Sequence, residues 1–285
     1  MTRRPWNSYV NIAFVSVALA GFASPSMSAQ ETPNTSERKP ILVLSELTAW
    51  PKPQQESKTI WTLNGLNPTF VLYNDGLVIF KKWKDSLELF SAELTPAEMH
   101  TWLEGLDIAA FLKLEGSYYT NNFFDQPTSV IYWQDHTIKR VMVSGPIRDS
   151  EADRNKAPQA FLKIFNRLIA FHHTNARMWE PEKVQLHVIP YTNSEGEPVA
   201  WPNGWPDLND RTTKDTSRAY GTGESYNIHL SGDQRDELEQ ILSGLKNKQA
   251  ILMNERLWSV FPHRYCLPGE ELWIDPKSFA CSAER

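Results

Sequence analysis

This chain of 285 residues lacks the short motifs that mark the common classes of enzyme. It has no Gly-x-Ser-x-Gly pentapeptide, which excludes the usual nucleophile elbow of an α/β-hydrolase. It has no phosphate loop, and the run from Gly221 to Ser225 is too short and wrongly ordered for a dinucleotide fingerprint. The sequence therefore predicts no catalytic residue and no cofactor, which favours a protein that is not an enzyme.

The sequence contains no pair of histidines at a spacing that is typical of a metal site. The seven histidines include no His-Glu-x-x-His or His-x-His pair. His172 and His173 are adjacent, so on a helix their side chains diverge by about 100° and do not readily chelate one ion. We predict no metal site.

Positive charge is in the minority. Removing residues 1–29 takes only Arg3 and Arg4 from the 29 basic residues, so 27 basic side chains face 34 acidic ones and the formal net charge is −7. This balance opposes non-specific binding to nucleic acid or anionic lipid. We therefore expect no nucleic-acid partner.

The N-terminal apolar run, residues 10–23, is about 14 residues long, short of the ~20 that span a bilayer. Arg3 and Arg4 precede this run, and small residues up to Ala29 follow it. This order predicts a signal peptide over residues 1–29 and a soluble periplasmic or secreted protein without a stable membrane anchor. The alternatives are a retained anchor and twin-arginine export.

Cysteine occurs only twice, as Cys266 and Cys281. An even count in an oxidising compartment predicts a disulfide between them, and two separate thiols are the alternative. Cys266 paired with His263 as a nucleophile is a further, less favoured reading, because neighbours in sequence rarely reach the required geometry.

What the chain does contain is a clear fold signal. Residues 69–83 hold two apolar runs around Asn74, Asp75 and Gly76, which predicts a β-hairpin because these three residues tolerate tight chain reversal. Further hairpins are expected at 129–143 and 250–261. Helices are expected at 95–106, where Thr95 opens a capping box, at 158–171, and after a second capping box at Ser231.

These elements predict an α+β fold in which antiparallel hairpins pack against about three capped helices. We expect a polar, disordered leader at 30–40, an α+β domain at 41–180, and a smaller α+β region at 181–285 with a long loop and a terminal hairpin. The two helix starts at Thr95 and Ser231 also share their apolar spacing, which indicates either a duplication or the commonest way to begin a helix.

The chain resembles a group of uncharacterised exported bacterial proteins in three short stretches. These are a Phe-x-Leu-Tyr-x-Asp-Gly hairpin within residues 68–79, the strand opening Gln126-Pro127-Thr128-Ser129-Val130, and a Trp-bearing hairpin that leads into residues 267–270. The resemblance implies export and an α+β fold. It implies no activity and no site residue.

Ten tryptophans remain after signal cleavage, and two of them lie in the long loop expected at residues 190–224. Strand or helix packing accounts for four of the ten, Trp83, Trp102, Trp133 and Trp258, but less well for Trp201 and Trp205. These two are candidates for ligand contact, with anchoring of the loop onto the domain as the expected alternative. The leading hypothesis is a binding protein of the cell envelope whose ligand or protein partner is unknown. The rival hypotheses are a hydrolase acting on envelope material and a structural or assembly factor.

Overall fold

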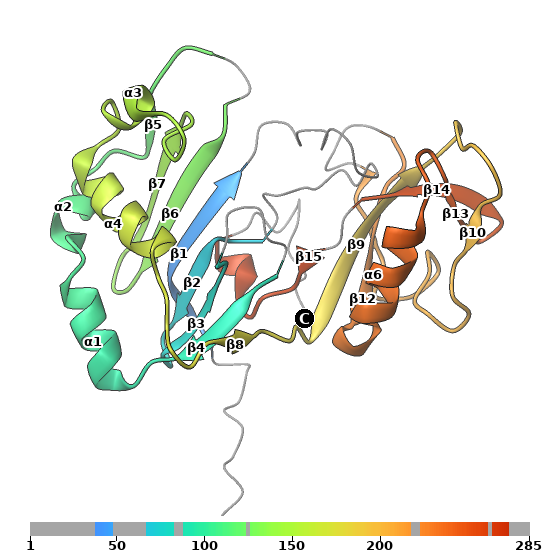
Figure 1. Ribbon diagram of the computed structural model, residues 1–285, viewed down its shortest axis with the longest axis horizontal. Helices are drawn as coiled ribbons and strands as arrows, with labels where there is room; N and C mark the ends of the chain where they lie inside the picture. Colours follow the sequence, from blue (N-terminus) through green and yellow to red (C-terminus); the bar gives the residue numbers. More distant parts are fainter. Residues whose placement is uncertain are drawn as a thin grey trace, which may run out of the picture. The chain divides into compact units, whose positions relative to one another are not determined.

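The computed structural model describes residues 38–47, 67–82, 88–123, 126–217, 223–261 and 264–273, which all belong to one compact unit. The predicted signal peptide, most of the predicted leader, His263 and Cys281 lie outside the described residues. The fold is α+β, as expected, with two sheets and flanking helices (Figure 1).

The first sheet, sheet A, has the strand order β5-β7-β6-β1-β2-β3-β4-β8. Neighbouring strands are antiparallel except β5 and β7, which are parallel. Its strands are β1 (Pro40–Leu47), β2 (Phe70–Tyr73), β3 (Leu77–Phe80), β4 (Phe90–Glu93), β5 (Ser117–Tyr119), β6 (Thr128–Gln134), β7 (Ile138–Ser144) and β8 (Arg177–Met178).

The predicted hairpin of residues 69–83 lies in the middle of sheet A as β2 and β3, with Trp83 outside the described residues. Every residue of both strands is buried, because side chains on both faces of the sheet are covered. Phe70, Leu72 and Val78 belong to the core on the helix side, and Val71 and Ile79 to the core on the other side. Their uninterrupted apolar sequence reflects this two-sided burial.

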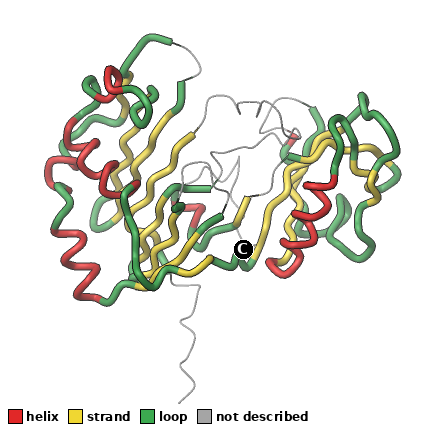
Figure 2. Tube along the Cα trace, viewed as in Figure 1, coloured by secondary structure: helices red, strands yellow, loops and turns green. Residues whose placement is uncertain are grey.

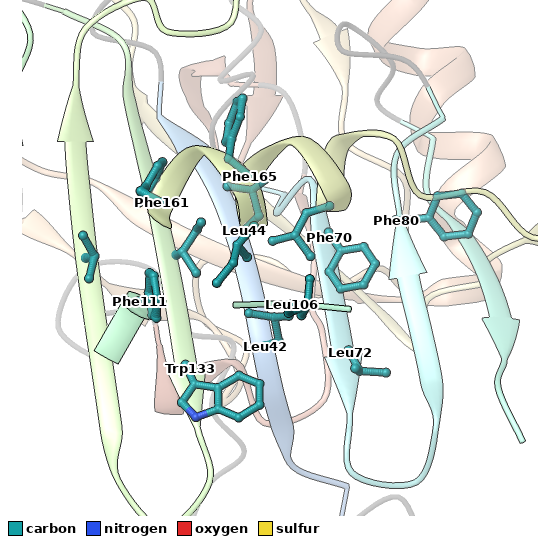
Figure 3. Packing of buried hydrophobic residues seen from close by; sticks show 14 of the residues in the cluster. Leu42, Leu44, Phe70, Leu72, Phe80, Leu106, Phe111, Trp133, Phe161 and Phe165 are labelled. Atoms are coloured by element: carbon teal, nitrogen blue, oxygen red, sulfur yellow. The ribbon is translucent and has the colours of Figure 1, made fainter. Parts of the chain in front are cut away.

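Helices cover one face of sheet A (Figure 2). Figure 3 shows the buried side chains gathered where α4 (Gln159–Ile169) crosses the strands. The helix α1 (Pro96–Glu104) begins with the predicted capping box of Thr95 and Glu98. In contrast, α4 has Pro158 at its N-cap and no side-chain cap, so its apolar face must stabilise it. The short helices α2 (Ile108–Leu112) and α3 (Glu151–Arg154) were not predicted.

The second sheet, sheet B, follows the order β10-β13-β14-β9-β12-β11, and β15 also pairs with β9. Its strands are β9 (Lys183–Pro190), β10 (Val199–Ala200), β11 (Lys214–Asp215), β12 (Tyr226–Ser231), β13 (Ile251–Met253), β14 (Arg256–Val260) and β15 (Arg264–Tyr265). The Ser231 capping box opens η2 (Gly232–Gln234), which runs into α6 (Arg235–Gly244). The 3-10 helix η3 (Glu270–Leu272) ends the described chain.

The strands of sheet A lie between residues 40 and 178, and those of sheet B between 183 and 265. One core cluster contains side chains from both, including Val71 and Ile79 of sheet A and Val184 and Leu186 of sheet B. The predicted domain boundary at residue 180 and the predicted duplication stay predictions. Within the described part of the chain, no helix combines the length and apolarity needed to cross a membrane.

Candidate functional site

The two tryptophans of the long loop, Trp201 and Trp205, pack against each other. Their ring centroids are 5.4 Å apart at an interplanar angle of 87°. Trp201 is 8% exposed, its indole Nε1 donates to the Pro206 carbonyl at 3.0 Å, and its backbone N–H donates to the Leu252 carbonyl. Trp205 is half-buried against the same core. The pair therefore ties the loop to sheet B, and Trp205 presents more surface than Trp201 does.

A different pair of aromatic residues, Tyr119 and Phe123, is exposed. No sequence pattern predicted a site in this segment. We call residues 119–123, from the end of β5 to Phe123, the contact segment. Tyr119 is 71% exposed and Phe123 is 77% exposed, the two largest values among the apolar side chains described as exposed. Single exposed apolar residues are ordinary, but two aromatic rings on five residues form a surface that suits a partner.

The contact segment is held in place by the carboxylate of Asp153 on α3. Thr120 Oγ1 and Asn121 Nδ2 each donate to Asp153 Oδ1 at 2.6 Å, and Ser150 Oγ donates to Oδ2 at 2.6 Å. These hydrogen bonds from Ser150, Thr120 and Asn121 lower the pKa of Asp153, because they stabilise the charged carboxylate. The carboxylate is thus ionised at neutral pH and fixes the segment between the two exposed rings.

Gly145 allows the contact segment to approach the end of β7 closely. Its φ is +136°, and a Cβ there would lie 1.8 Å from Thr120 Oγ1. Any other residue would displace Thr120 and with it the bond to Asp153. The position of Tyr119 therefore depends on a glycine 26 residues later in the chain.

The exposed end of sheet A continues from Tyr119 across three further strands. Tyr119 pairs with Ser144, Ser144 with Thr128, and Thr128 with Leu47. Side chains at paired positions point to the same face, so these four form one row across β5, β7, β6 and β1. Leu47 is 41% exposed at the other end of this row. Since β5 is the terminal strand of the order, no described strand pairs with its outer edge.

The second cluster of interest lies on sheet B and consists of buried polar side chains. Arg264 and Glu270 are 1% and 2% exposed and form a bidentate ion pair with N–O distances of 3.0 and 2.8 Å. Arg264 Nη2 also donates to Gln185 Oε1 at 3.2 Å, and His229 Nε2 lies 3.3 Å from the same oxygen. His229 Nδ1 lies 2.8 Å from the Thr212 carbonyl.

Both histidines of this sheet have a lowered pKa. Burial lowers the pKa of His229 to about 4, with smaller contributions from Lys214, Arg264 and Lys183. Burial also lowers the pKa of His187, against a 2.8 Å hydrogen bond between its Nδ1 and Asn227 Oδ1. Both rings are therefore neutral at pH 7. The contact segment and this polar cluster are the two candidate sites.

Among the described residues, no group of three or more histidine, cysteine or carboxylate side chains is placed to hold a metal ion. Cys266 follows β15, and its backbone N–H donates to the Lys183 carbonyl at 3.0 Å. Its predicted partner, Cys281, lies outside the described residues, so the disulfide stays a prediction. Thiol labelling of the unreduced, denatured protein tests it.

Comparisons with protein-family models, with curated proteins and with solved structures found no match to this chain.

Sequence reasoning missed both candidate sites. The aromatic residues around position 120 stand in an irregular stretch, and the one available signal was Ser150 followed three residues later by Asp153, a helix-start pattern. The polar cluster gave no local signal, because Gln185, His229 and Glu270 come from separate parts of the chain and meet only in the fold.

Proposed function

We propose that this protein is exported and acts as a binding protein in the periplasm or outside the cell. The contact segment is the docking point, and its ligand is another protein of the envelope. The observation that carries the proposal is the pair of exposed aromatic rings, Tyr119 and Phe123, on a segment fixed by Asp153.

Aromatic side chains on a fixed backbone suit protein recognition for two reasons. Each ring offers a large apolar area, and the two side-chain torsions lose little entropy on binding. A segment that is already held in place loses less backbone freedom than a mobile loop would. Centrally placed aromatic residues are also common among those that carry most of the binding energy of an interface.

Site-specific photo-crosslinking tests the docking point. Tyr119 is replaced by p-benzoylphenylalanine in the producing cells, and Ile138 serves as the matched position. Ile138 is 68% exposed on the same sheet, but it lies at the far end of β7 from Ser144, the residue that pairs with Tyr119. We expect a discrete protein adduct from position 119 and none from 138, with a lower yield after Asp153→Ala. Equal adducts from both positions, or none from 119, would contradict the proposal.

Export has its own test. N-terminal sequencing of the protein recovered outside the cytoplasm should begin at Ala29 or Gln30, as the tripartite order of residues 1–29 predicts. An intact Met1 in a membrane fraction would refute export by a cleaved signal.

The second candidate function is the hydrolase acting on envelope material. It is supported by one observation, the neutral His229 beside the buried pair of Arg264 and Glu270. Perturbed titratable groups of this kind mark catalytic sites, but structural networks perturb them as well. The ion pair and the two acceptors around His229 favour the structural role. Turnover of cell-wall material by the wild type, abolished by His229→Asn without loss of fold, would favour the hydrolase over the binding protein.

A further inference from the structure

The outer edge of β5 is the edge that faces away from β7. On the inner edge, the Met142 N–H of β7 donates to the Gly116 carbonyl at 2.9 Å, and the Thr120 N–H donates to the Ser144 carbonyl of β7 at 3.0 Å. Gly116 and Thr120 flank β5, so these two bonds bracket its three residues. They fix which backbone groups of β5 face β7 and which face outward.

Successive residues of a strand direct their N–H and carbonyl groups to opposite edges. Gly116 and Thr120 bond to β7, so Tyr118, which lies two residues from each, also faces β7. Ser117 and Tyr119 therefore direct their backbone groups outward, and both residues are exposed. Within the described residues, these outward groups have no hydrogen-bond partner. Two N–H groups and two carbonyls are thus available at this edge.

Both ends of β5 are tied down, so its outer edge has a fixed conformation. At the start, the Glu115 N–H donates to the Tyr118 hydroxyl at 2.8 Å. At the end, Asp153 accepts a hydrogen bond from the Thr120 hydroxyl at 2.6 Å. Tyr118 packs against the helix-side core, so the side chain of its neighbour Tyr119 points to the opposite face of the sheet. A partner would pair with an edge that is already ordered, which lowers the entropy cost of binding.

Charged side chains near β5 carry both signs. Lys113 and Glu115 precede it, Arg140 lies on β7 and Glu151 on α3, and all four are exposed. This mixture does not favour a strongly acidic or a strongly basic ligand. The features left for recognition are the outward backbone groups and the exposed aromatic rings. An extended polypeptide is the ligand whose N–H and carbonyl groups alternate at the spacing that a strand edge requires.

We propose that the partner binds by strand addition: an extended segment of the partner protein pairs with the outer edge of β5 and extends sheet A by one strand. This inference rests on the proposed function, since it takes the contact segment as the docking point. In antiparallel addition, two partner residues two positions apart exchange four hydrogen bonds with Ser117 and Tyr119. The partner side chain beside Tyr119 then lies on the same face as its ring, where an aromatic or β-branched residue packs best.

A proline at the edge tests strand addition. Ser117→Pro removes an outward N–H but no bond to β7, because the Ser117 N–H faces away from that strand. Ser117→Ala keeps the N–H and is the matched control. Both variants carry p-benzoylphenylalanine in place of Tyr119 in the producing cells. We expect at least about fivefold less protein adduct from Ser117→Pro than from Ser117→Ala at an unchanged melting temperature, because the proline removes one hydrogen bond and puts its ring at the paired edge.

A second measurement maps the pairing without the proline. The photo-crosslinker replaces Ser117 in one protein and Tyr119 in another, and mass spectrometry locates the residue of the partner to which each is attached. The two side chains lie on one face of β5, about 7 Å apart. Strand addition therefore predicts that both attach within about four residues of each other in a single partner segment.

The outcomes separate this inference from the proposed function. No adduct in the Ser117→Ala background would contradict the docking point itself. Equal adducts from Ser117→Ala and Ser117→Pro, or attachment to two separate segments of the partner, would leave the docking point intact and refute strand addition. An adduct of twice the mass of this chain would refute it as well, because the added strand would belong to a second copy. Where the proline lowers the melting temperature, the attachment sites alone decide.

Discussion

The helix-covered face of sheet A and the face of sheet B that carries Gln185 and Asn227, here called its polar face, are both buried. They differ in the kind of side chain that is buried. On sheet A the buried side chains are aliphatic and aromatic, such as Leu44, Phe70 and Phe80. On sheet B they include Gln185, Asn227 and Arg264, each at most 3% exposed. A buried apolar side chain must fit its neighbours in shape and volume. A buried polar side chain must in addition have a correctly oriented hydrogen-bond partner for each donor and acceptor.

This difference decides how each region should respond to mutation. A truncated apolar side chain leaves a cavity whose cost depends on local collapse. A truncated polar side chain leaves its former partner buried and unsatisfied, which costs more than the net value of the bond. Sheet B should therefore show strong coupling between paired polar residues. In the core of sheet A, losses should add only for side chains that do not contact each other.

The largest expected effect is in the apolar core of sheet A. Phe70 is fully buried and contacts the rings of Trp102 and Phe171, with centroids 5.4 and 5.2 Å away. Phe70→Ala should lower the free energy of unfolding by about 3–5 kcal/mol, measured by urea denaturation. Leu47→Ala, at an exposed position of the same sheet, is the control and should change it by less than about 0.5 kcal/mol. A loss below about 1.5 kcal/mol for Phe70→Ala would show that this core repacks easily.

The second largest loss of stability is expected on the polar face of sheet B. Arg264→Met leaves Glu270 charged and buried without its partner, so it should destabilise the protein by about 3 kcal/mol or more. The double variant Arg264→Met with Glu270→Met removes both charges and should recover most of that loss. Calorimetry or urea denaturation of the two single variants and the double variant completes the cycle. Simple addition of the two single losses would contradict the coupling that the ion pair implies.

The third effect separates the two tryptophans of the long loop. Trp201 is 8% exposed and fills core space, so Trp201→Ala should cost about 3 kcal/mol. Trp205 is half-buried, so Trp205→Ala should cost about 1 kcal/mol and lower the melting temperature less. Thermal melts of both variants check the ranking. An unchanged melting temperature for the double variant would show that Trp201 and Trp205 do not stabilise the fold, and would favour a role in ligand contact.

The smallest change in stability is expected from a substitution in a turn, and one turn from each sheet is compared. In sheet A the turn after β2 uses Gly76 at φ +88°, where a Cβ would lie 2.3 Å from the Leu94 carbonyl oxygen. In sheet B the two-residue turn between β13 and β14 puts Asn254 and Glu255 at φ 49° and 62°. Glu255→Gly should stabilise the protein by about 0.5–1 kcal/mol, because glycine adopts this conformation without the Cβ penalty. Gly76→Ala is the opposing control and should destabilise; a loss from both variants would show that the Glu255 turn is not strained.

Local sequence patterns predicted much of the fold. The hairpin at Asn74–Gly76, the capping boxes at Thr95 and Ser231, and the apolar face of residues 159–169 all depend on neighbours within a few residues, and the structure confirms these elements. The two-residue strands β8, β10, β11 and β15 were missed. Each is defined by its pairing with another strand and not by a pattern of its own.

The sequence by itself determined the α+β class, the central hairpin of sheet A and the helix that packs over it, because side-chain periodicity and turn chemistry act at short range. Only the tertiary structure decided the two candidate sites. Asp153 meets Thr120 across 33 residues, and Arg264 meets Gln185 across 79. Hydrogen bonds are directional and reach about 3 Å, so such partners can be paired only after the chain has been folded.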